Sequence, residues 1–260
     1  MRGAAGGPRL AGKGVLVTGG SSGIGYATVR RFIREQARVF LCGDDEAQVD
    51  QALVGLGGGE TVAGMCCDVS REDEVSTLVA TAAQWLAGID VLVNNAGIAR
   101  REPFLQITPA SFDRTVAVNL RGTFLVAQAV ARHMVERGEG GVIINMSSTN
   151  GLGGEEHYAH YNATKAGVLL LTKTMAVELG RHNIRVNALC PGYIQTPLNA
   201  AIAADLDDTF VAEYVRTRIP IGRPGTVDDV AAAYAFLASD DASFIHGAEL
   251  VIDGGQLAVM

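Results

Sequence analysis

Residues 18–25 read Thr-Gly-Gly-Ser-Ser-Gly-Ile-Gly, and this stretch decides the fold of the chain. It directly follows a short apolar run at residues 15–17 and opens a helix that the pattern predicts over residues 24–36. Glycines between a strand and a helix let the backbone approach a pyrophosphate closely, and the first turn of the helix offers free N–H donors. A plain turn is the alternative for a glycine-rich loop alone, but the flanking strand and helix favour a dinucleotide site.

Short apolar runs alternate with longer helical patterns along the rest of the chain. Apolar strands that alternate with helices are typical of a parallel sheet covered by helices on both faces. We therefore predict the α/β class, with one Rossmann-type, doubly wound parallel sheet of about seven strands. The predicted strands are residues 15–17, 39–42, 62–67, 89–93, 142–145, 184–189 and 250–252. The predicted helices are residues 24–36, 46–56, 72–86, 109–137, 160–180, 209–218 and 227–238.

The length of 260 residues fits a single large domain. Hydrophobic residues make up 48% of the chain and charged residues 19%, so a sizeable buried core is possible. We predict one domain over residues 13–260, preceded by a flexible tail over residues 1–12. The tail contains Gly, Arg and Pro but no apolar stretch, which argues against a secretory signal.

The composition argues against several classes of partner. The net charge of −7 is unfavourable for binding nucleic acid or an anionic membrane surface. No stretch approaches the length of a membrane span, so we expect a cytoplasmic protein. The cysteines form no C-x-x-C pattern, and we expect buried free thiols rather than a disulfide framework or a metal site. The cysteines are Cys42, Cys66, Cys67 and Cys190.

A tyrosine and a lysine four residues apart, Tyr161 and Lys165, share one face of a predicted helix. Ser148 precedes the tyrosine by thirteen residues, so the three side chains can converge on one reacting oxygen. A neighbouring ammonium lowers the pKa of a phenol, which is ordinarily ~10. A tyrosine tuned in this way can pass a proton to or from a carbonyl or alcohol oxygen. For the Tyr-x-x-x-Lys pair alone, a surface pair is the alternative.

Several neighbours compete for roles at this site. Tyr158 is a second tyrosine, but Asn162 rather than a lysine follows it four residues later. Ser147 stands beside Ser148, and a structural hydroxyl at the strand end is its favoured interpretation. His157 and His160 flank the site, and we expect them to be solvated rather than catalytic.

Two further motifs follow predicted strands. Asp68-Val69 ends the third strand and can flank an adenine ring, although Asp68 could instead cap the next helix. Asn94-Asn-Ala-Gly97 ends the fourth strand. The carboxyl ends of parallel strands line the ligand crevice of such sheets, so this turn is a candidate for the cofactor site, with a plain turn as the alternative.

Together these motifs resemble the short-chain dehydrogenase/reductase family, in its compact branch. The resemblance extends over residues 13–255 and implies a Rossmann-type fold that moves a hydride between a nicotinamide cofactor and a carbonyl or alcohol. The motifs occur in the order and spacing of the family. They are TGGSSGIG at residues 18–25, NNAG at residues 94–97, Asn119, Ser148, Tyr161, Lys165 and Pro191-Gly192.

The resemblance implies a role for each of these residues. Tyr161 is the general acid/base, and Lys165 binds the nicotinamide ribose and lowers the tyrosine pKa. Ser148 hydrogen-bonds the substrate oxygen, and Asn119 holds a water for a proton relay with Lys165. Residues 193–219 form the mobile substrate loop. The implied cofactor contacts, besides Tyr161 and Lys165, are Gly19, Ser22, Gly23, Ile24 and Gly25 for the phosphates, Asp68 and Val69 for adenine, Asn95, Ala96 and Gly97 for the ribose, and Pro191, Gly192, Ile194 and Thr196 around the nicotinamide.

The residue just after the second strand discriminates between NAD and NADP. A carboxylate there accepts hydrogen bonds from the ribose 2′-hydroxyl and repels a 2′-phosphate. Asp44 stands where many NADP-dependent members have arginine, and Gly43 where many NAD-dependent members have aspartate. We therefore predict that NAD(H) is preferred and NADP(H) is possible. The alternative is that Asp44 caps the next helix.

These observations predict an NAD(P)(H)-dependent oxidoreductase that interconverts a secondary alcohol and a ketone. A 3-oxoacyl thioester (acyl-carrier-protein) reductase using NADPH is one alternative, with Arg132, Arg137 and Arg181 as candidates to hold the acidic carrier. A catalytically silent dinucleotide-binding regulator is an alternative of another class. The helix over residues 160–180 is apolar nearly all round, which favours a homo-oligomer, a tetramer by resemblance to the family.

Overall fold

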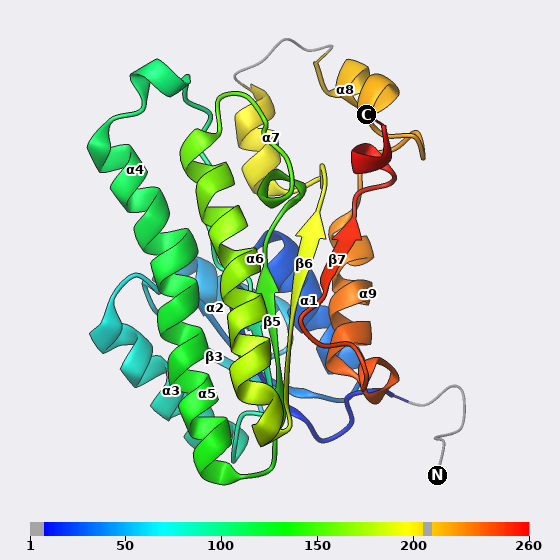
Figure 1. Cartoon of the computed structure of the whole chain (residues 1–260). Coiled ribbons are helices and arrows are strands. Elements are labelled where there is room, and N and C mark those ends of the chain that lie inside the picture. Colours follow the sequence, from blue (N-terminus) through cyan, green and yellow to red (C-terminus); the bar gives the residue numbers. More distant parts are fainter. Residues whose placement is uncertain (1–7, 205–209, 260) are drawn as a thin grey trace.

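The centre of the computed structural model, which describes residues 8–204 and 210–259, is a seven-stranded sheet in the order β3-β2-β1-β4-β5-β6-β7 (Figure 1). All neighbouring strands pair in parallel, which confirms the predicted fold class. The strands are β1 (Gly14–Thr18), β2 (Arg38–Gly43), β3 (Val62–Cys66), β4 (Val91–Asn94), β5 (Gly141–Met146), β6 (Ile184–Pro191) and β7 (Glu249–Ile252).

Two hydrophobic clusters lie on opposite faces of this sheet. Val15 and Val17 of β1 pack in one cluster with α1, α2 and α9, whereas Leu16 packs in the other with α3, α5 and α6. A strand covered on both faces needs an apolar residue at nearly every position, which explains its continuous apolar run. The helices are α1 (Gly23–Arg34), α2 (Glu46–Gly55), α3 (Glu72–Leu86), α4 (Pro109–Val116), α5 (Thr123–Arg137), α6 (Ala159–Leu179), α7 (Pro197–Ala204), α8 (Phe210–Arg218) and α9 (Val227–Ala238).

The strand order reverses direction at β1, which lies between β2 and β4. In open parallel sheets of this kind, the ligand crevice lies outside the carboxyl ends of the strands at the point of reversal. The loops that follow β1, β4, β5 and β6 therefore meet at one edge. They carry the glycine-rich stretch, the NNAG turn, Ser148 and Pro191-Gly192.

The helix predicted over residues 109–137 is not continuous. Its middle, η2 (Ala117–Gly122), is a π-helical turn between α4 and α5, and Asn119 lies in it. A π turn accommodates an extra residue without changing the apolar character of the helix, so the hydrophobic pattern gave no signal of it. The sequence does not predict helix α7, because its pattern indicates a loop over residues 193–219 with one helix, residues 209–218, near its end. Residues 205–209 of that predicted loop lie outside the described residues.

Residues 8–12, which are predicted to belong to a flexible tail, contact the domain. Residues 1–7 of it lie outside the described residues, but Leu10 is only 1% exposed and belongs to the cluster around β1. The Leu10 N–H donates to the carbonyl of Glu35, at 3.3 Å. Residues 8–12 therefore pack against the domain, since an apolar side chain in this segment finds a place in its core.

The four cysteines are free thiols, and three of them are buried as expected. Cys66 is exposed, so the prediction of a buried thiol is wrong for this residue. Cys66 ends β3 and Cys67 follows it, and neighbouring residues of a strand point to opposite sides. In the described part of the chain, no helix has the length and apolar character needed to span a membrane.

Candidate active site

A cavity of about 1090 Å³ runs along the carboxyl edge of the sheet. It extends from Asp44 and Asp68, past the glycine-rich loop, to Ser148 and Tyr161. All the site residues predicted from the sequence line this cavity, except Gly25 and Asn119, which are buried beside lining residues. Motifs separated by more than a hundred residues in the sequence are thus brought into one continuous space.

The glycine-rich loop presents a helix N-terminus to the cavity. Helix α1 begins at Gly23, and neither the N-cap residue Ser22 nor an acidic side chain of the first turn caps its amides. Gly19 has a positive φ of 63°, and a Cβ added to Gly25 would lie 1.9 Å from the Gly19 carbonyl oxygen. The loop therefore packs closely on the helix. The uncapped N–H donors lie at the positive end of the helix dipole. This arrangement fits the diphosphate of a dinucleotide.

The two aspartates that follow β2, at the far end of the cavity, have different roles. The side chain of Asp45 accepts a hydrogen bond from the Gln48 N–H at 2.9 Å and so caps α2. Asp44 is exposed and lines the cavity without serving as the cap. A Cβ added to Gly43 would lie 2.4 Å from Ser21 Oγ, so a side chain one position earlier would require Ser21 to move. Asp44 is therefore the carboxylate available to a ribose.

Asp68 does not cap α3, whose N-cap residue is Arg71. Its carboxylate accepts hydrogen bonds from Ser70 Oγ at 2.7 Å and from Arg114 at 3.1 Å. Partial burial raises the pKa of Asp68, but the hydrogen bonds from Ser70 and Arg114 lower it further, so that it lies below its ordinary value. An ionised carboxylate thus lines the end of the cavity expected to hold adenine.

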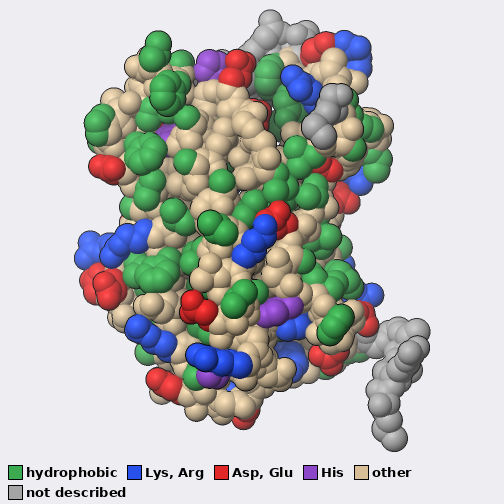
Figure 2. Space-filling view, in the orientation of Figure 1, with side chains coloured by type: hydrophobic (Ala, Val, Ile, Leu, Met, Phe, Trp, Pro, Cys, Tyr) green, Lys and Arg blue, Asp and Glu red, His purple; other side chains and the backbone are tan. Residues whose placement is uncertain are grey.

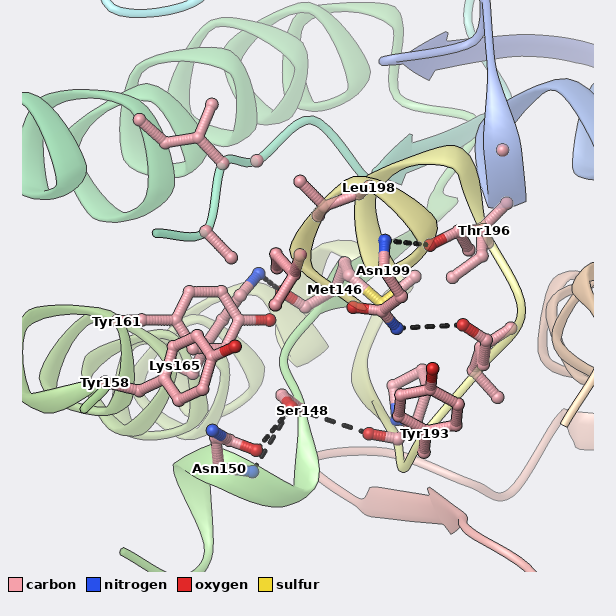
Figure 3. Close-up of a pocket in the computed structure, with 18 of the residues that line it drawn as sticks. Met146, Ser148, Asn150, Tyr158, Tyr161, Lys165, Tyr193, Thr196, Leu198 and Asn199 are labelled. Atoms are coloured by element: carbon pink, nitrogen blue, oxygen red, sulfur yellow. Dashed lines mark hydrogen bonds between the residues drawn. The ribbon is translucent and has the colours of Figure 1, made fainter. Parts of the chain in front are cut away.

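The catalytic end is built from α6 and from the loops after β5 and β6 (Figure 3). Tyr161 lies in the first turn of α6, and Lys165 lies one turn later on the same face. The Lys165 ammonium donates to the Met146 carbonyl at 2.9 Å and lies 5.5 Å from the centre of the Tyr161 ring. Tyr158 and Tyr161 point into the same space, with Ser148 across from them. These groups can surround one substrate oxygen.

The pKa of Tyr161 differs from the prediction. Burial raises the pKa of this phenol to about 12, although the hydroxyl of Ser148 lowers it in part. The expectation that Lys165 depresses the tyrosine pKa is wrong in this structure, because the ammonium is directed at the Met146 carbonyl. Burial lowers the pKa of Lys165 itself to about 8. The phenol is therefore protonated at neutral pH.

The unfolding free energy of the wild-type protein should rise with pH above the folded-state pKa of Lys165. Replacing Lys165 with methionine should remove this rise. The folded-state pKa of Lys165 is about 8, whereas an unfolded lysine titrates near ~10.4. Between these two pH values the unfolded chain binds more protons than the folded chain, so stability rises with pH. The contribution of this residue is at most ~1.4 kcal/mol per pH unit. Denaturant unfolding at a series of pH values measures the slope.

Lys173→Met is the matched control for this measurement. Lys173 lies on the same helix, is exposed, and pairs with Glu249 at 2.7 Å. We expect its variant to keep the wild-type slope above pH ~8. A Lys165→Met protein that also keeps the wild-type slope would contradict the lowered pKa.

Asn119 is held by the backbone of the loop after β4. Its Oδ1 accepts from the Ile98 N–H and its Nδ2 donates to the Ile98 carbonyl, both at 2.8 Å. A Cβ added to Gly97 would lie 3.2 Å from Asn119 Oδ1 and 3.5 Å from Lys165 Nζ. The side chains of Asn119 and Lys165 thus approach each other at Gly97. The water relay between them stays a prediction.

His160 is not solvated, and that prediction is wrong. Its side chain is 0% exposed, and its Nε2 lies 3.1 Å from a carboxylate oxygen of Glu102. The same carboxylate accepts a hydrogen bond from Ser111 of α4. The loop after β4 and α4 cover this face of α6, which a helical pattern alone does not reveal. His160 therefore links these segments at the start of the helix that carries Tyr161.

Sequence reasoning also missed several residues that line the catalytic end. Thr196 was predicted as a nicotinamide contact, and its Oγ1 also accepts from the Asn199 N–H at 3.1 Å at the start of α7. A threonine before a proline that begins a helix is a cap signal that could have revealed α7. The lining residues without an assigned role include Asn150, Glu155, Tyr158, Tyr193, Asn199, Tyr214 and Gln256.

Comparison with known proteins identifies the family. The family model described as enoyl-(acyl carrier protein) reductase matches residues 19–256. An L-rhamnose 1-dehydrogenase (NAD(P)(+)) of Azotobacter vinelandii is 41% identical, over 94% of this chain and 96% of the relative. The chain belongs to the short-chain dehydrogenase/reductase family.

Other short-chain dehydrogenase/reductases agree with this assignment. A 3-oxoacyl-[acyl-carrier-protein] reductase of Thermotoga maritima is 40% identical, over 95% of this chain and 98% of the relative. The crystal structure of a levodione reductase superposes with a TM-score of 0.91 at 35% identity, covering 97% of this chain and 100% of that one. As a member of the family, the chain is an NAD(P)-dependent oxidoreductase that acts on CH–OH groups.

Proposed function

We propose that this short-chain dehydrogenase/reductase prefers NAD(H) and interconverts a secondary alcohol and a ketone, with Tyr161 as the general acid/base. The observation that carries the cofactor preference is the exposed carboxylate of Asp44 in the cavity, one residue before the cap of α2. An NADP 2′-phosphate would meet this negative charge, whereas a ribose 2′-hydroxyl would donate to it.

The rest of the cavity would hold the dinucleotide through backbone amides and through side chains that flank the adenine. The uncapped amides of residues 23–25 would bind the diphosphate, and Asp68 and Val69 would flank the adenine. Asn95 ties this region together, since its Nδ2 donates to the carbonyls of Thr18 and Gly19 at 3.1 and 3.2 Å. The bound nicotinamide would accept or supply the hydride of the reaction.

The proton would move through residues of the chain. Ser148 Oγ accepts from the Asn150 N–H at 3.2 Å and lies 3.4 Å from Asn150 Oδ1 and 3.5 Å from the Pro191 carbonyl, and it would hold the substrate oxygen. The Tyr161 hydroxyl would give its proton to the oxygen of a ketone, and in the reverse direction the Tyr161 phenolate would take the proton from an alcohol. Lys165, with its pKa near neutrality, and Asn119 would relay the proton onward.

Replacing Asp44 with arginine should reverse the cofactor preference. The substitution exchanges a repelling carboxylate for a guanidinium that pairs with a 2′-phosphate. We expect the ratio of NADPH to NADH affinity to rise by on the order of 100-fold, because a charge-assisted hydrogen bond is gained and a repulsion is lost. Fluorescence titration of purified protein with each reduced cofactor measures both affinities.

Asp50→Arg is the matched control for the change of charge. Asp50 is exposed on α2 but does not line the cavity, so this variant should keep the wild-type ratio. Wild-type protein that binds NADPH more tightly than NADH, or an Asp44→Arg variant with an unchanged ratio, would remove Asp44 from the ribose site.

The thioester reductase alternative is weakened at its proposed carrier surface. Of the three arginines considered for an acidic carrier, Arg137 already pairs with Asp90 and with Glu139. At the catalytic end of the cavity, the lining carboxylates Glu155, Glu156 and Glu213 outnumber the lining arginines Arg101 and Arg218. An acidic partner would be repelled there. The alcohol/ketone reaction is therefore the favoured proposal.

We also propose that the protein is a homotetramer built through α5 and α6. Leu170 and Val177 on α6 are 68% and 85% exposed, and Phe124 on α5 is 41% exposed. Figure 2 shows hydrophobic side chains at the surface over these helices. Exposed apolar side chains gathered on one face mark interaction surfaces. Light scattering would measure the number of chains per particle.

The cytoplasmic location stays a prediction from the sequence.

A further inference from the structure

A carboxylate that the reaction does not require lines the catalytic end of the cavity. Glu155 lies in the loop between η3 (Thr149–Gly151) and α6, and it is partly buried. Burial raises its pKa above the ordinary value, although Asn150, Arg218 and Arg101 act in the opposite direction. A partly buried carboxylate that faces a cavity needs donors, and a bound ligand can supply them.

Glu155 lines the same cavity as Tyr158, Tyr161 and Tyr214. Its charge raises the pKa of Tyr158 and Tyr214, after burial, and it also contributes to the raised pKa of Tyr161. The catalytic tyrosine and this carboxylate therefore face a common space. A substrate bound with its reacting carbon at Tyr161 would share this cavity with Glu155.

A chain of side-chain amides sets the position of Glu155 relative to Ser148. The Asn150 N–H donates to Ser148 Oγ at 3.2 Å, and Asn150 Nδ2 donates to Asn162 Oδ1 at 2.9 Å. Asn162 Nδ2 in turn donates to the main-chain carbonyl of Glu155 at 2.9 Å. Binding groups held in this way lose little conformational freedom when a ligand arrives. The backbone at Glu155 is thus held relative to Ser148.

Aromatic rings form another wall of the same space. The rings of Tyr193 and Tyr214 pack at a tilt of 46° with their centres 5.4 Å apart, and the Phe210 ring centre lies 5.9 Å from that of Tyr214. Gln256 Nε2 donates to the Tyr214 hydroxyl at 2.9 Å and fixes its ring. In Figure 3 Tyr193 lies across the pocket from Tyr158 and Tyr161. Such rings offer a flat apolar face with polar edges, which suits a ring-shaped ligand.

The charge of the cavity selects among classes of ligand. A purely apolar ring or acyl chain would remove water from Glu155 without providing a donor, which is unfavourable. An anionic substrate would meet three carboxylates, those of Glu155, Glu156 and Glu213. The lining residues Arg101 and Arg218 offset only part of this negative charge. A neutral ring with several hydroxyl groups satisfies both the carboxylate and the aromatic wall.

We infer that Glu155 is a substrate-binding residue and that the substrate is a neutral, polyhydroxylated ring. A hydroxyl beside the reacting carbon donates to the Glu155 carboxylate, and one face of the ring lies against Tyr193 and Tyr214. This inference rests on the proposed oxidoreductase function. It assigns Glu155 to specificity and not to the transfer of the proton or the hydride.

The test compares six-membered rings that differ in their polar groups. The substrates are a panel of pyranoses and inositols, cyclohexanol, and 4-hydroxycyclohexanecarboxylate, each offered with NAD⁺ and with NADP⁺. We expect the best polyol to exceed cyclohexanol in kcat/KM by ~10-fold or more. Glu155→Gln should lower kcat/KM for that polyol by ~10-fold or more, mainly through KM, and change that for cyclohexanol by less than ~2-fold.

Two controls keep the outcomes separable. Glu178→Gln makes the same change at an exposed position of α6 that does not line the cavity, and it should leave all rates unchanged. NADH affinity of Glu155→Gln, measured by fluorescence titration, shows that the variant is folded. Faster turnover of cyclohexanol or of the carboxylate than of every polyol would overturn the inference, as would an equal loss on all substrates. If no alcohol reduced either cofactor, the proposed function itself would fail.

Discussion

Tyr161→Phe is expected to lower kcat by ~1000-fold or more, while the affinity for NADH stays within ~3-fold of wild type. The substitution removes the hydroxyl that would pass the proton but keeps the ring. That ring packs with its centre 6.0 Å from the Tyr158 ring, and the Lys165 ammonium lies 5.5 Å from it. Steady-state turnover of an alcohol and fluorescence titration with NADH measure the two quantities separately.

Tyr158→Phe is the matched comparison for this prediction. Both tyrosines line the cavity, but only Tyr161 has a lysine one helical turn later. We expect the loss of kcat in Tyr158→Phe to be at least ~10-fold smaller than in Tyr161→Phe. Turnover retained by Tyr161→Phe would mean that another group moves the proton. An equal loss in both variants would mean that the two hydroxyls act together.

The fold was predictable because its signals are local and repeated. The apolar run of β1, the glycine-rich loop and the start of α1 follow one another within residues 14–25, and each strand after them repeats the alternation. The π turn at Asn119 was not predictable in this way. It depends on the packing of α4 and α5 around the loop after β4, where Ile98 binds the Asn119 side chain from a distance of 21 residues.

The chemistry of the site depended on burial, which the sequence pattern does not report. The spacing of Ser148, Tyr161 and Lys165 correctly placed these residues around one cavity. It gave the wrong direction for the pKa of Tyr161, because the cost of removing water exceeds the effect of neighbouring donors. The sequence also could not decide whether Asp44 caps α2. Asp45 does so, one residue later, and only the backbone geometry distinguishes the two.

Gly25→Ala is expected to destabilise the fold by about 3 kcal/mol and to weaken dinucleotide binding by at least ~100-fold. An added Cβ would lie 1.9 Å from the Gly19 carbonyl oxygen and 2.8 Å from Asn95 Nδ2. The backbone of the loop cannot give way like a flexible side chain, so loop and helix must separate. That separation moves the amides of the first turn of α1, which the diphosphate would bind. Denaturant unfolding and NADH titration measure the two effects.

Gly154→Ala separates this packing effect from the general effect of adding a methyl group. A Cβ at Gly154 would have no heavy atom within 4 Å, and the φ of Gly154 lies outside the left-handed region. The unfolding free energy of the Gly154→Ala variant should therefore remain within ~1 kcal/mol of wild type. The two variants share the same change of side chain and of unfolded-state entropy. Their difference therefore reports the contact between Gly25 and Gly19. Gly25→Ala that binds NADH as tightly as wild type would contradict this prediction. The loop would then relax without moving the phosphate site, and the close packing of the loop on the helix would not position the dinucleotide.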